Sequence, residues 1–394
     1  MNRLFMRRHF VPLARRLPAA LQRPLRWLWH TTAPQAKPSA QRFDDADYLA
    51  RVEAETAIFN DQVQVHDLPQ IYHYWSNTYL RPKLETFGFS NPDQFFAHYL
   101  ERAYADAPTR PARFISIGAG NSDTEIRIAK MLRERGITNY TLECLELNPT
   151  MIERGRALAR EEGLDEQILP VRGDFNLWQP EGRYDAIMAN QSLHHVSNLE
   201  GLFTAIDSAL TPQGRFITSD MIGRNGHQRW PEALAIVQEF WQELPMERRY
   251  NLQLQRKEPK FLDWDCSVAG FEGIRAQDIL PLLIERFDFE FFLGFANVID
   301  PFIDRGFGHH FDANSPADLA FIDRVHARDE EEILAGNISP THAMAVMRHK
   351  SDAQWKNSDR AAHETTIWKQ LTPKFCLRDP AEEPAAKRAG SARA

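Results

Sequence analysis

Residues 114–120 have the sequence Phe-Ile-Ser-Ile-Gly-Ala-Gly, and this stretch decides the fold. A short apolar run that stops at a glycine is typical of a buried strand, because glycine lets the backbone turn sharply. Apolar residues then recur at helical spacing over residues 126–132, and Gly136 follows. A strand, a glycine turn and a helix in this order begin a βαβ unit, so the stretch predicts a parallel sheet.

The same alternation continues along the chain. Further strand patterns lie at residues 140–147, 168–171, 184–189, 215–222, 289–298 and 342–348. Helical patterns lie at residues 151–163, 199–210, 279–287 and 319–334. Crossover helices between parallel strands cover both faces of a sheet. We therefore predict an α/β fold with a doubly wound, mostly parallel sheet.

Differences in composition divide the 394 residues into a core, a helical segment before it, an insert within it and two ends. The insert, at residues 224–273, is rich in Trp, Arg, Gln and Glu, and it is predicted to fold back over a substrate as a lid. The ends are predicted to lie outside the packed structure. The expected parts are a flexible basic extension at 1–42, a helical segment at 43–111, the core at 112–223 and 274–349, the lid insert at 224–273 and a polar, disordered tail at 350–394.

Composition excludes several classes of protein. With 43% apolar and 26% charged residues, the chain can bury a sizeable core. Charged residues interrupt its most apolar stretch, at 279–303, so no membrane-spanning helix is expected. Three widely spaced cysteines fit neither a disulfide framework nor a zinc site, and they favour a reducing compartment. No Asp/Asp/Asn set stands out, so we predict no metal.

Charge is unevenly distributed along the chain, whose formal net charge is −7. Residues 1–42 hold eight Arg, one Lys and no acid, and the remaining 38 basic and 54 acidic residues give −16. An acidic body is a poor partner for nucleic acid. The basic arm has two interpretations: an anchor in weak contact with an anionic membrane surface, or a loosely ordered extension, which its prolines favour. We expect a cytoplasmic protein, with peripheral contact to the inner face of a membrane as the alternative.

Polar residues follow three successive strands of the predicted sheet. Ligands of an open parallel sheet bind beyond the carboxyl ends of its strands. Gly118 and Gly120 follow the first strand, and Glu146 follows the second. A carboxylate at Glu146 can accept both hydroxyls of a ribose, while Asp174 and Phe175 after the third strand suit the amine and the ring of an adenine. Each residue alone also fits an ordinary turn or helix start, but their succession favours a nucleoside ligand.

Position 123 separates two candidate cofactors. A dinucleotide fold has the pattern G-x-G-x-x-G, and here its third glycine is replaced by Asp123. A carboxylate at that place is unfavourable for a pyrophosphate. S-adenosylmethionine carries a sulfonium and an ammonium and has no phosphate, so an acidic loop suits it better than it suits NAD.

Residues 114–222 resemble the class I S-adenosylmethionine-dependent methyltransferases. The resemblance lies in Ile-Ser-Ile-Gly-Ala-Gly at 115–120, Leu-Glu-Leu-Asn at 145–148, Gly-Asp-Phe at 173–175, and the stretches at 184–196 and 210–216. It implies a seven-stranded, Rossmann-like sheet whose last strand is antiparallel, with N-terminal helices and a helical lid insert. It also implies S-adenosylmethionine as the cofactor, with contacts at Gly118, Gly120, Asn121, Asp123, Glu146, Leu147, Asp174, Phe175, Asn190 and Gln191.

Two positions depart from the family pattern. The family usually has an acid two residues before the first glycine, where this chain has Ser116, and it often has a third glycine where this chain has Ser122. Asp123 or Glu125 is the candidate to replace the missing acid as the contact of the methionine ammonium.

Methyl transfer from a sulfonium needs mainly an oriented acceptor, and a hydroxyl acceptor also benefits from a general base. His194 and His195 follow the fourth strand, and either is a candidate base; Asp220, at the end of the fifth strand, is another. Their alternative roles are packing against the next helix and capping it. In the insert, Arg224, His227, Arg229 and Trp230 are candidate substrate contacts.

These features predict methyl transfer to a polar small molecule or a glycan precursor, at a hydroxyl. The Asn/Asp-Pro-Pro-aromatic motif of base-modifying methyltransferases is absent at residues 190–192, which again argues against nucleic acid. A non-catalytic, cofactor-binding partner of an enzyme complex is the alternative, since Ser116 and Ser122 would permit it. An NAD-dependent oxidoreductase is disfavoured by Asp123. The oligomeric state is left open.

Overall fold

The computed structural model describes residues 46–60, 68–268, 270–350 and 371–378, which all fall in the unit Asp44–Ala394. The predicted basic extension at 1–42 lies outside the described residues, as does most of the predicted tail. Within the described ranges, no helix combines the length and the apolar character that crossing a bilayer requires.

Seven strands form one sheet in the order β3-β2-β1-β4-β5-β9-β8. Strands β1 to β5 pair in parallel, and β9 is antiparallel to both β5 and β8. This order confirms the predicted doubly wound, Rossmann-like sheet with an antiparallel last strand. The strands are β1 (Ala112–Ile117), β2 (Tyr140–Glu146), β3 (Ile168–Arg172), β4 (Tyr184–Asn190), β5 (Leu210–Met221), β8 (Phe287–Phe295) and β9 (His342–His349).

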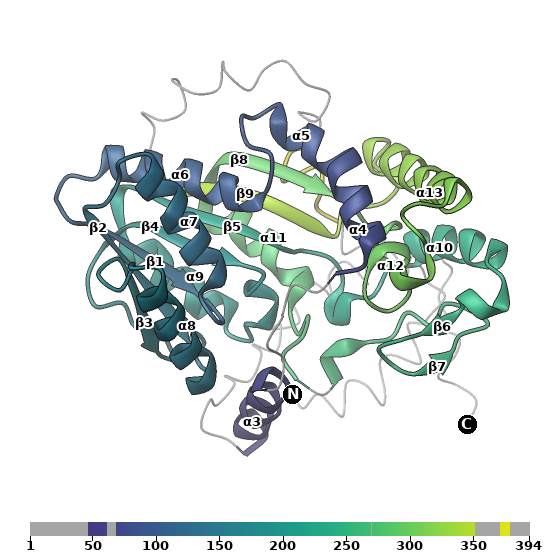
Figure 1. Cartoon of the computed structure of the whole chain (residues 1–394), viewed down its shortest axis with the longest axis horizontal. Coiled ribbons are helices and arrows are strands. Elements are labelled where there is room, and N and C mark those ends of the chain that lie inside the picture. The colour runs from purple at the N-terminus through teal and green to yellow at the C-terminus, as the bar shows by residue number, and fades with distance from the viewer. Residues whose placement is uncertain (1–45, 61–67, 269, 351–370, 379–394) are drawn as a thin grey trace, which may run out of the picture. The chain divides into compact units, whose positions relative to one another are not determined.

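Helices cover both faces of this sheet (Figure 1). Side chains alternate between the faces, so Phe114 and Ile217 belong to one apolar cluster while Ile115 and Phe216 belong to the other. The first cluster includes α6 (Pro92–Asp106), α7 (Asp123–Glu134) and α8 (Pro149–Glu161); the second includes α9 (Leu199–Ala209) and α11 (Ala276–Arg286). Burial on both faces explains the nearly continuous apolar runs of the central strands β1 and β4, whereas the edge strand β3 is largely exposed.

The N-terminal helices expected within 43–111 are present. Helix α3 (Ala46–Asn60) lies against the carboxyl ends of the strands, where the Tyr48 hydroxyl donates to Asp174 and Asn148 Nδ2 donates to the Thr56 carbonyl. The others are α4 (Gln70–Trp75), a π-helical turn η1 (Ser76–Leu80), α5 (Arg81–Glu85) and α6.

The insert contains one long helix, α10 (Pro231–Glu243), together with short turns and a two-stranded ribbon. Phe240 and Trp241 of this helix pack on Phe302 of α12 (Asp300–Ile303), and Phe240 also packs on Phe321 of α13 (Pro316–Leu334). The remaining elements are η3 (Asn225–His227), η4 (Met246–Arg248), β6 (Tyr250–Asn251), β7 (Arg256–Lys257), η5 (Cys266–Val268) and η6 (Gly308–His310).

Part of the predicted disordered tail is packed, which corrects that prediction for residues 371–378. Leu371 and Cys376 are buried in the main apolar cluster, and the Arg378 guanidinium pairs with Glu232 of α10. The composition of residues 350–394 as a whole is polar, and it hides this short segment in which apolar residues recur.

Candidate active site

The glycine turn after β1 is pressed against the turn after β4. Gly118 and Gly120 have φ values of 70° and 56°, a region that side chains with a Cβ rarely adopt. A Cβ added at Gly118 would lie 2.6 Å from Ser192 Cβ. The Ser192 hydroxyl also donates to the Ile117 carbonyl at 2.6 Å. Only glycine allows this close approach, so the predicted need for glycine here has a structural reason.

Glu146 links the glycine turn to the start of α8. Its carboxylate accepts from the backbone N–H groups of Gly120 at 2.9 Å and Asn148 at 2.8 Å. Burial raises the pKa of Glu146, while these N–H donors and the charge of His195 oppose the rise. The side chain is therefore held in one orientation at the end of β2, as the prediction for a ribose contact requires.

Asp174 lies at the same edge of the sheet, since the Gly173 N–H donates to the Glu146 carbonyl at 3.0 Å. Its carboxylate accepts from the Asn176 N–H at 2.9 Å and from the Tyr48 hydroxyl at 2.6 Å. Phe175 packs in the apolar cluster below, with its ring on the Gly118 side. The strand ends thus bring Glu146 and Asp174 together under α3.

Two acceptor atoms beside the glycine turn are buried without a hydrogen-bond partner: Asn121 Oδ1 and Glu125 Oε2. The other oxygen of Glu125 accepts from the Ser116 hydroxyl at 2.7 Å. Glu125 thereby places a carboxyl group next to Ser116, where the family pattern has its acid. Unsatisfied buried acceptors need donors, and an ammonium group supplies them, so these residues fit the methionine end of S-adenosylmethionine. Asp123 is instead paired with Arg127 at 3.2 Å.

Burial raises the pKa of Glu125 from 4.5 to about 7. A raised carboxyl pKa means that the native state binds more protons than the unfolded state between these values, so native stability falls as pH rises through them. We expect Glu125→Gln to raise the free energy of unfolding at pH 8 by up to about 3 kcal/mol and to change it little at pH 4.5. Urea unfolding of the ligand-free protein at both pH values measures this, with Glu134→Gln on the exposed side of α7 as control. An equal change in the free energy of unfolding at both pH values would contradict the raised pKa of Glu125.

The remaining predicted cofactor residues line the same turns. Leu147 and Asn190 are half-buried, and Gln191 is exposed with φ 52°. The Gln191 N–H donates to the Ser219 carbonyl of β5 at 2.8 Å, which fixes the turn after β4. Their contacts with a cofactor stay a prediction.

His195 lies on the turn η2 (Leu193–His195) after β4. Its Nδ1 is 2.6 Å from Glu55 Oε1 of α3, and its Nε2 is 3.5 Å from Glu272 Oε2. Glu55 Oε2 also accepts from the Phe271 N–H at 3.2 Å. A carboxylate at Nδ1 favours the tautomer protonated there, which leaves the Nε2 lone pair able to accept a proton.

His194 and Asp220 form a buried pair. The distance from His194 Nδ1 to Asp220 Oδ1 is 2.7 Å, and Asp220 is 1% exposed. Asp220 also accepts from the N–H groups of Ser192 at 2.9 Å and Leu193 at 2.7 Å. Burial opposes the charged imidazole, but Asp220 outweighs it and raises the pKa of His194 to about 10. Asp220 therefore positions η2 and His194, and its role as a base stays a prediction.

Of the four predicted substrate residues, only His227 joins the histidines: its ring centroid lies 5.1 Å from that of His194. Arg229 is buried, donates to the His227 carbonyl at 2.6 Å and pairs with Asp300 at 3.0 Å, so it anchors the insert to the core. The guanidinium groups of Arg224 and Arg378 lie over the Trp230 ring, at 5.7 and 4.3 Å from its centroid. These contacts hold Arg229 and Trp230 in place, and a role of either as a substrate contact stays a prediction.

Three residues of the site were not found by sequence reasoning: Tyr48, Glu55 and Glu272. Tyr48 and Glu55 come from α3, and Glu272 from the loop before α11. No motif or spacing marks any of them, because each reaches the site from a segment distant in the sequence.

Residues 90–276 match the family model described as "Methyltransferase domain". Together with the sheet order and the glycine turn, this match identifies a class I S-adenosylmethionine-dependent methyltransferase domain in the chain, and S-adenosylmethionine is the cofactor of that class.

Among curated proteins, the chain is 26% identical over 167 residues to a sterol 24-C-methyltransferase of Candida albicans, covering 40% of this chain and 43% of that protein. It is 24% identical over 183 residues to a sterol 24-C-methyltransferase of Yarrowia lipolytica, covering 44% of each. The chain thus spans less than half the length of these relatives. A geranyl diphosphate C-methyltransferase structure from Streptomyces coelicolor A3(2) is similar at 13% identity and a TM-score of 0.40, covering 80% of this chain and 100% of that one.

Proposed function

We propose that the protein transfers a methyl group from S-adenosylmethionine to a hydroxyl of a polar small molecule, of which a glycan precursor is one kind. Three imidazoles and three carboxylates meet at the carboxyl ends of β4 and β5: His194, His195, His227, Glu55, Asp220 and Glu272. Such a polar, ionisable site suits an acceptor that must lose a proton.

The single observation that carries this proposal is the geometry of His195. The His195 Nδ1 lies 2.6 Å from Glu55 Oε1, and the imidazole is near enough to Glu146, the expected ribose contact, to influence the pKa of that carboxyl group. A base held so close to the cofactor residues can take the proton of an acceptor hydroxyl as the methyl group is transferred. Bound at the glycine turn, S-adenosylmethionine would supply that methyl group in an electrophilic form.

Each residue of the site has a separate role in this proposal. Glu146 would accept the ribose hydroxyls, and Asn121 with Glu125 would accept from the methionine ammonium. His195 would hold the proton of the acceptor, with Glu55 fixing its tautomer and Asp220 fixing the turn on which it lies. The curated relatives are named as sterol C-methyltransferases, so methylation of an apolar acceptor at carbon is the second candidate.

A radiolabelled methyl transfer assay tests the proposal. The protein is incubated with labelled S-adenosylmethionine and two acceptor panels, one of polyhydroxylated compounds such as nucleotide sugars and one of sterols. Base-stable label in a polyhydroxylated product, located on oxygen by mass spectrometry, is the expected result. Label in sterols alone would overturn the acceptor class. Cofactor binding without transfer to either panel would favour a non-catalytic partner.

Removing the Glu146 carboxylate should weaken cofactor binding strongly. Glu146→Ala leaves the N–H groups of Gly120 and Asn148 without their acceptor and deletes the expected ribose contact. We expect a loss of about 2 to 3 kcal/mol, or roughly 30- to 150-fold in affinity for S-adenosylhomocysteine by calorimetry. Glu166→Ala, an exposed glutamate, is the control. Unchanged affinity in a folded variant would refute the ribose assignment.

A further inference from the structure

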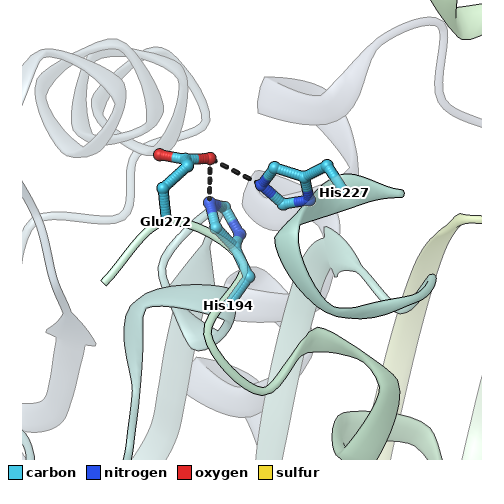
Figure 2. A group of neighbouring side chains, drawn as sticks. All are labelled: His194, His227 and Glu272. Atoms are coloured by element: carbon cyan, nitrogen blue, oxygen red, sulfur yellow. Dashed lines mark hydrogen bonds and ion pairs between the residues drawn. The ribbon is translucent and has the colours of Figure 1, made fainter. Parts of the chain in front are cut away.

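Three side chains from three turns converge on one point of the active site. Figure 2 shows the rings of His194 and His227 directed at the carboxylate of Glu272. His194 Nε2 is 3.4 Å and His227 Nε2 is 2.6 Å from Glu272 Oε1. Among the His, Cys, Asp and Glu side chains of the described residues, these three form a cluster whose potential metal-binding atoms all lie within 4.8 Å of one another.

The first ligand is already oriented by a carboxylate behind it. His194 Nδ1 lies 2.7 Å from Asp220 and keeps its proton there, so an ion bound at Nε2 would take the place of the proton that this nitrogen directs at Glu272. A histidine that binds a metal through one nitrogen commonly donates its other N–H to a carboxylate, which fixes the ring and raises its basicity. Asp220 is in turn held by backbone N–H groups of η2.

The second ligand is aimed by an unusual backbone. His227 adopts φ 54°, which non-glycine residues rarely do, next to Gly226 at φ 63°. A Cβ at Gly226 would lie 1.9 Å from Asp265 Oδ1, so the turn has no room for another residue there. Arg229 donates to the His227 carbonyl at 2.6 Å and fixes the turn from the other side.

The separations suit an ion after a small adjustment. Tetrahedral coordination with bonds of about 2.0 to 2.1 Å places donor atoms about 3.3 Å apart. The distance from His194 Nε2 to Glu272 Oε1 already has this value, at 3.4 Å. The 2.6 Å separation of His227 and Glu272 is a hydrogen bond whose proton occupies the place of the ion, and it would widen by about 0.7 Å.

We propose that His194, His227 and Glu272 bind a divalent transition-metal ion of the zinc type. Two imidazoles and one carboxylate are a donor set that suits zinc and its neighbours in the first row better than magnesium or calcium, which prefer oxygen ligands. Three protein ligands leave a fourth position for water or for an oxygen of a bound molecule. The ion site is independent of the acceptor proposed above, because it requires only the three side chains and Asp220.

Cobalt(II) titration tests the site in the full-length protein, after removal of bound metal with a chelator. Four-coordinate cobalt gives intense visible bands, and zinc should displace it. We expect one equivalent of cobalt in the wild-type protein, and about a 100-fold weaker affinity in His227→Ala and Glu272→Gln. His309→Ala and Glu247→Gln alter exposed residues of the same types and serve as matched controls that should bind as the wild type does.

The outcomes separate this site from the methyl transfer itself. Calorimetry with S-adenosylhomocysteine checks that each variant retains its cofactor site. An absence of visible cobalt bands in the wild-type protein overturns the proposal, and so does equal cobalt affinity in His227→Ala and His309→Ala. Both results stand whatever the methyl transfer assay gives. If Glu272→Gln fails to fold, His227→Ala alone decides, because that residue lies on a turn at the edge of the core.

Discussion

Replacing His195 with alanine should abolish most turnover while leaving cofactor affinity nearly unchanged. A positioned general base contributes about 10²- to 10⁴-fold to a rate. We therefore expect kcat, measured with the acceptor that the methyl transfer assay identifies, to fall by that factor. The reason lies in the Glu55–His195 pair, whose 2.6 Å contact orients the imidazole of the proposed base. Steady-state kinetics gives kcat, and calorimetry with S-adenosylhomocysteine gives the affinity.

His309→Ala is the matched control, since His309 is an exposed histidine on η6. Glu55→Gln supplies a second comparison. It keeps the shape of the side chain but weakens the hold on Nδ1, so it should lower kcat less than His195→Ala does. Full activity of His195→Ala would remove this residue as the base, and a parallel loss of cofactor affinity would make its role structural.

Replacing Asp220 with alanine should destabilise the fold by about 3 to 5 kcal/mol. The substitution leaves the His194 imidazole buried without its carboxylate and deprives the N–H groups of Ser192 and Leu193 of their acceptor. Since whole domains are stable by about 5 to 15 kcal/mol, the variant should unfold at a much lower urea concentration.

Asp165→Ala, at an exposed position after α8, should stay within about 0.5 kcal/mol of the wild type. Asp220→Asn tests the charge separately from the shape, because asparagine keeps one acceptor oxygen for the backbone donors. A loss below about 1 kcal/mol in Asp220→Ala would show that η2 is held by other contacts.

The sheet and its cofactor edge could be predicted because their signals are local. Strands β1 and β4 are apolar runs that stop at a glycine and an asparagine, and the carboxyl ends of parallel strands meet at one edge. Glu146 and Asp174 were therefore placed together without any long-range information, and the backbone bond from Gly173 to Glu146 bears that out. Strand β8 begins two residues before the predicted start at 289, since α11 ends at Arg286.

The acceptor side could be predicted only in part. His194, His195 and Asp220 directly follow strands, whereas Glu55 and Glu272 come from a helix and a loop that no periodicity connects to the sheet. For the same reason, no spacing in the sequence revealed the donor set of His194, His227 and Glu272, and no metal was expected. In the insert, residue type alone could not predict that Arg229 pairs with Asp300 and donates to the His227 carbonyl.

The contacts of helix α3 have a consequence for the rate at which the used cofactor is exchanged for a new one. Tyr48 holds Asp174, Glu55 holds His195, and Arg51 donates to the carbonyls of Ser267 and Gly270. One helix thus touches the expected adenine contact, the proposed base and the loop before Glu272. Detachment of α3 and release of the spent nucleoside would then be a single event, and its rate would set an upper bound on the number of catalytic cycles per second.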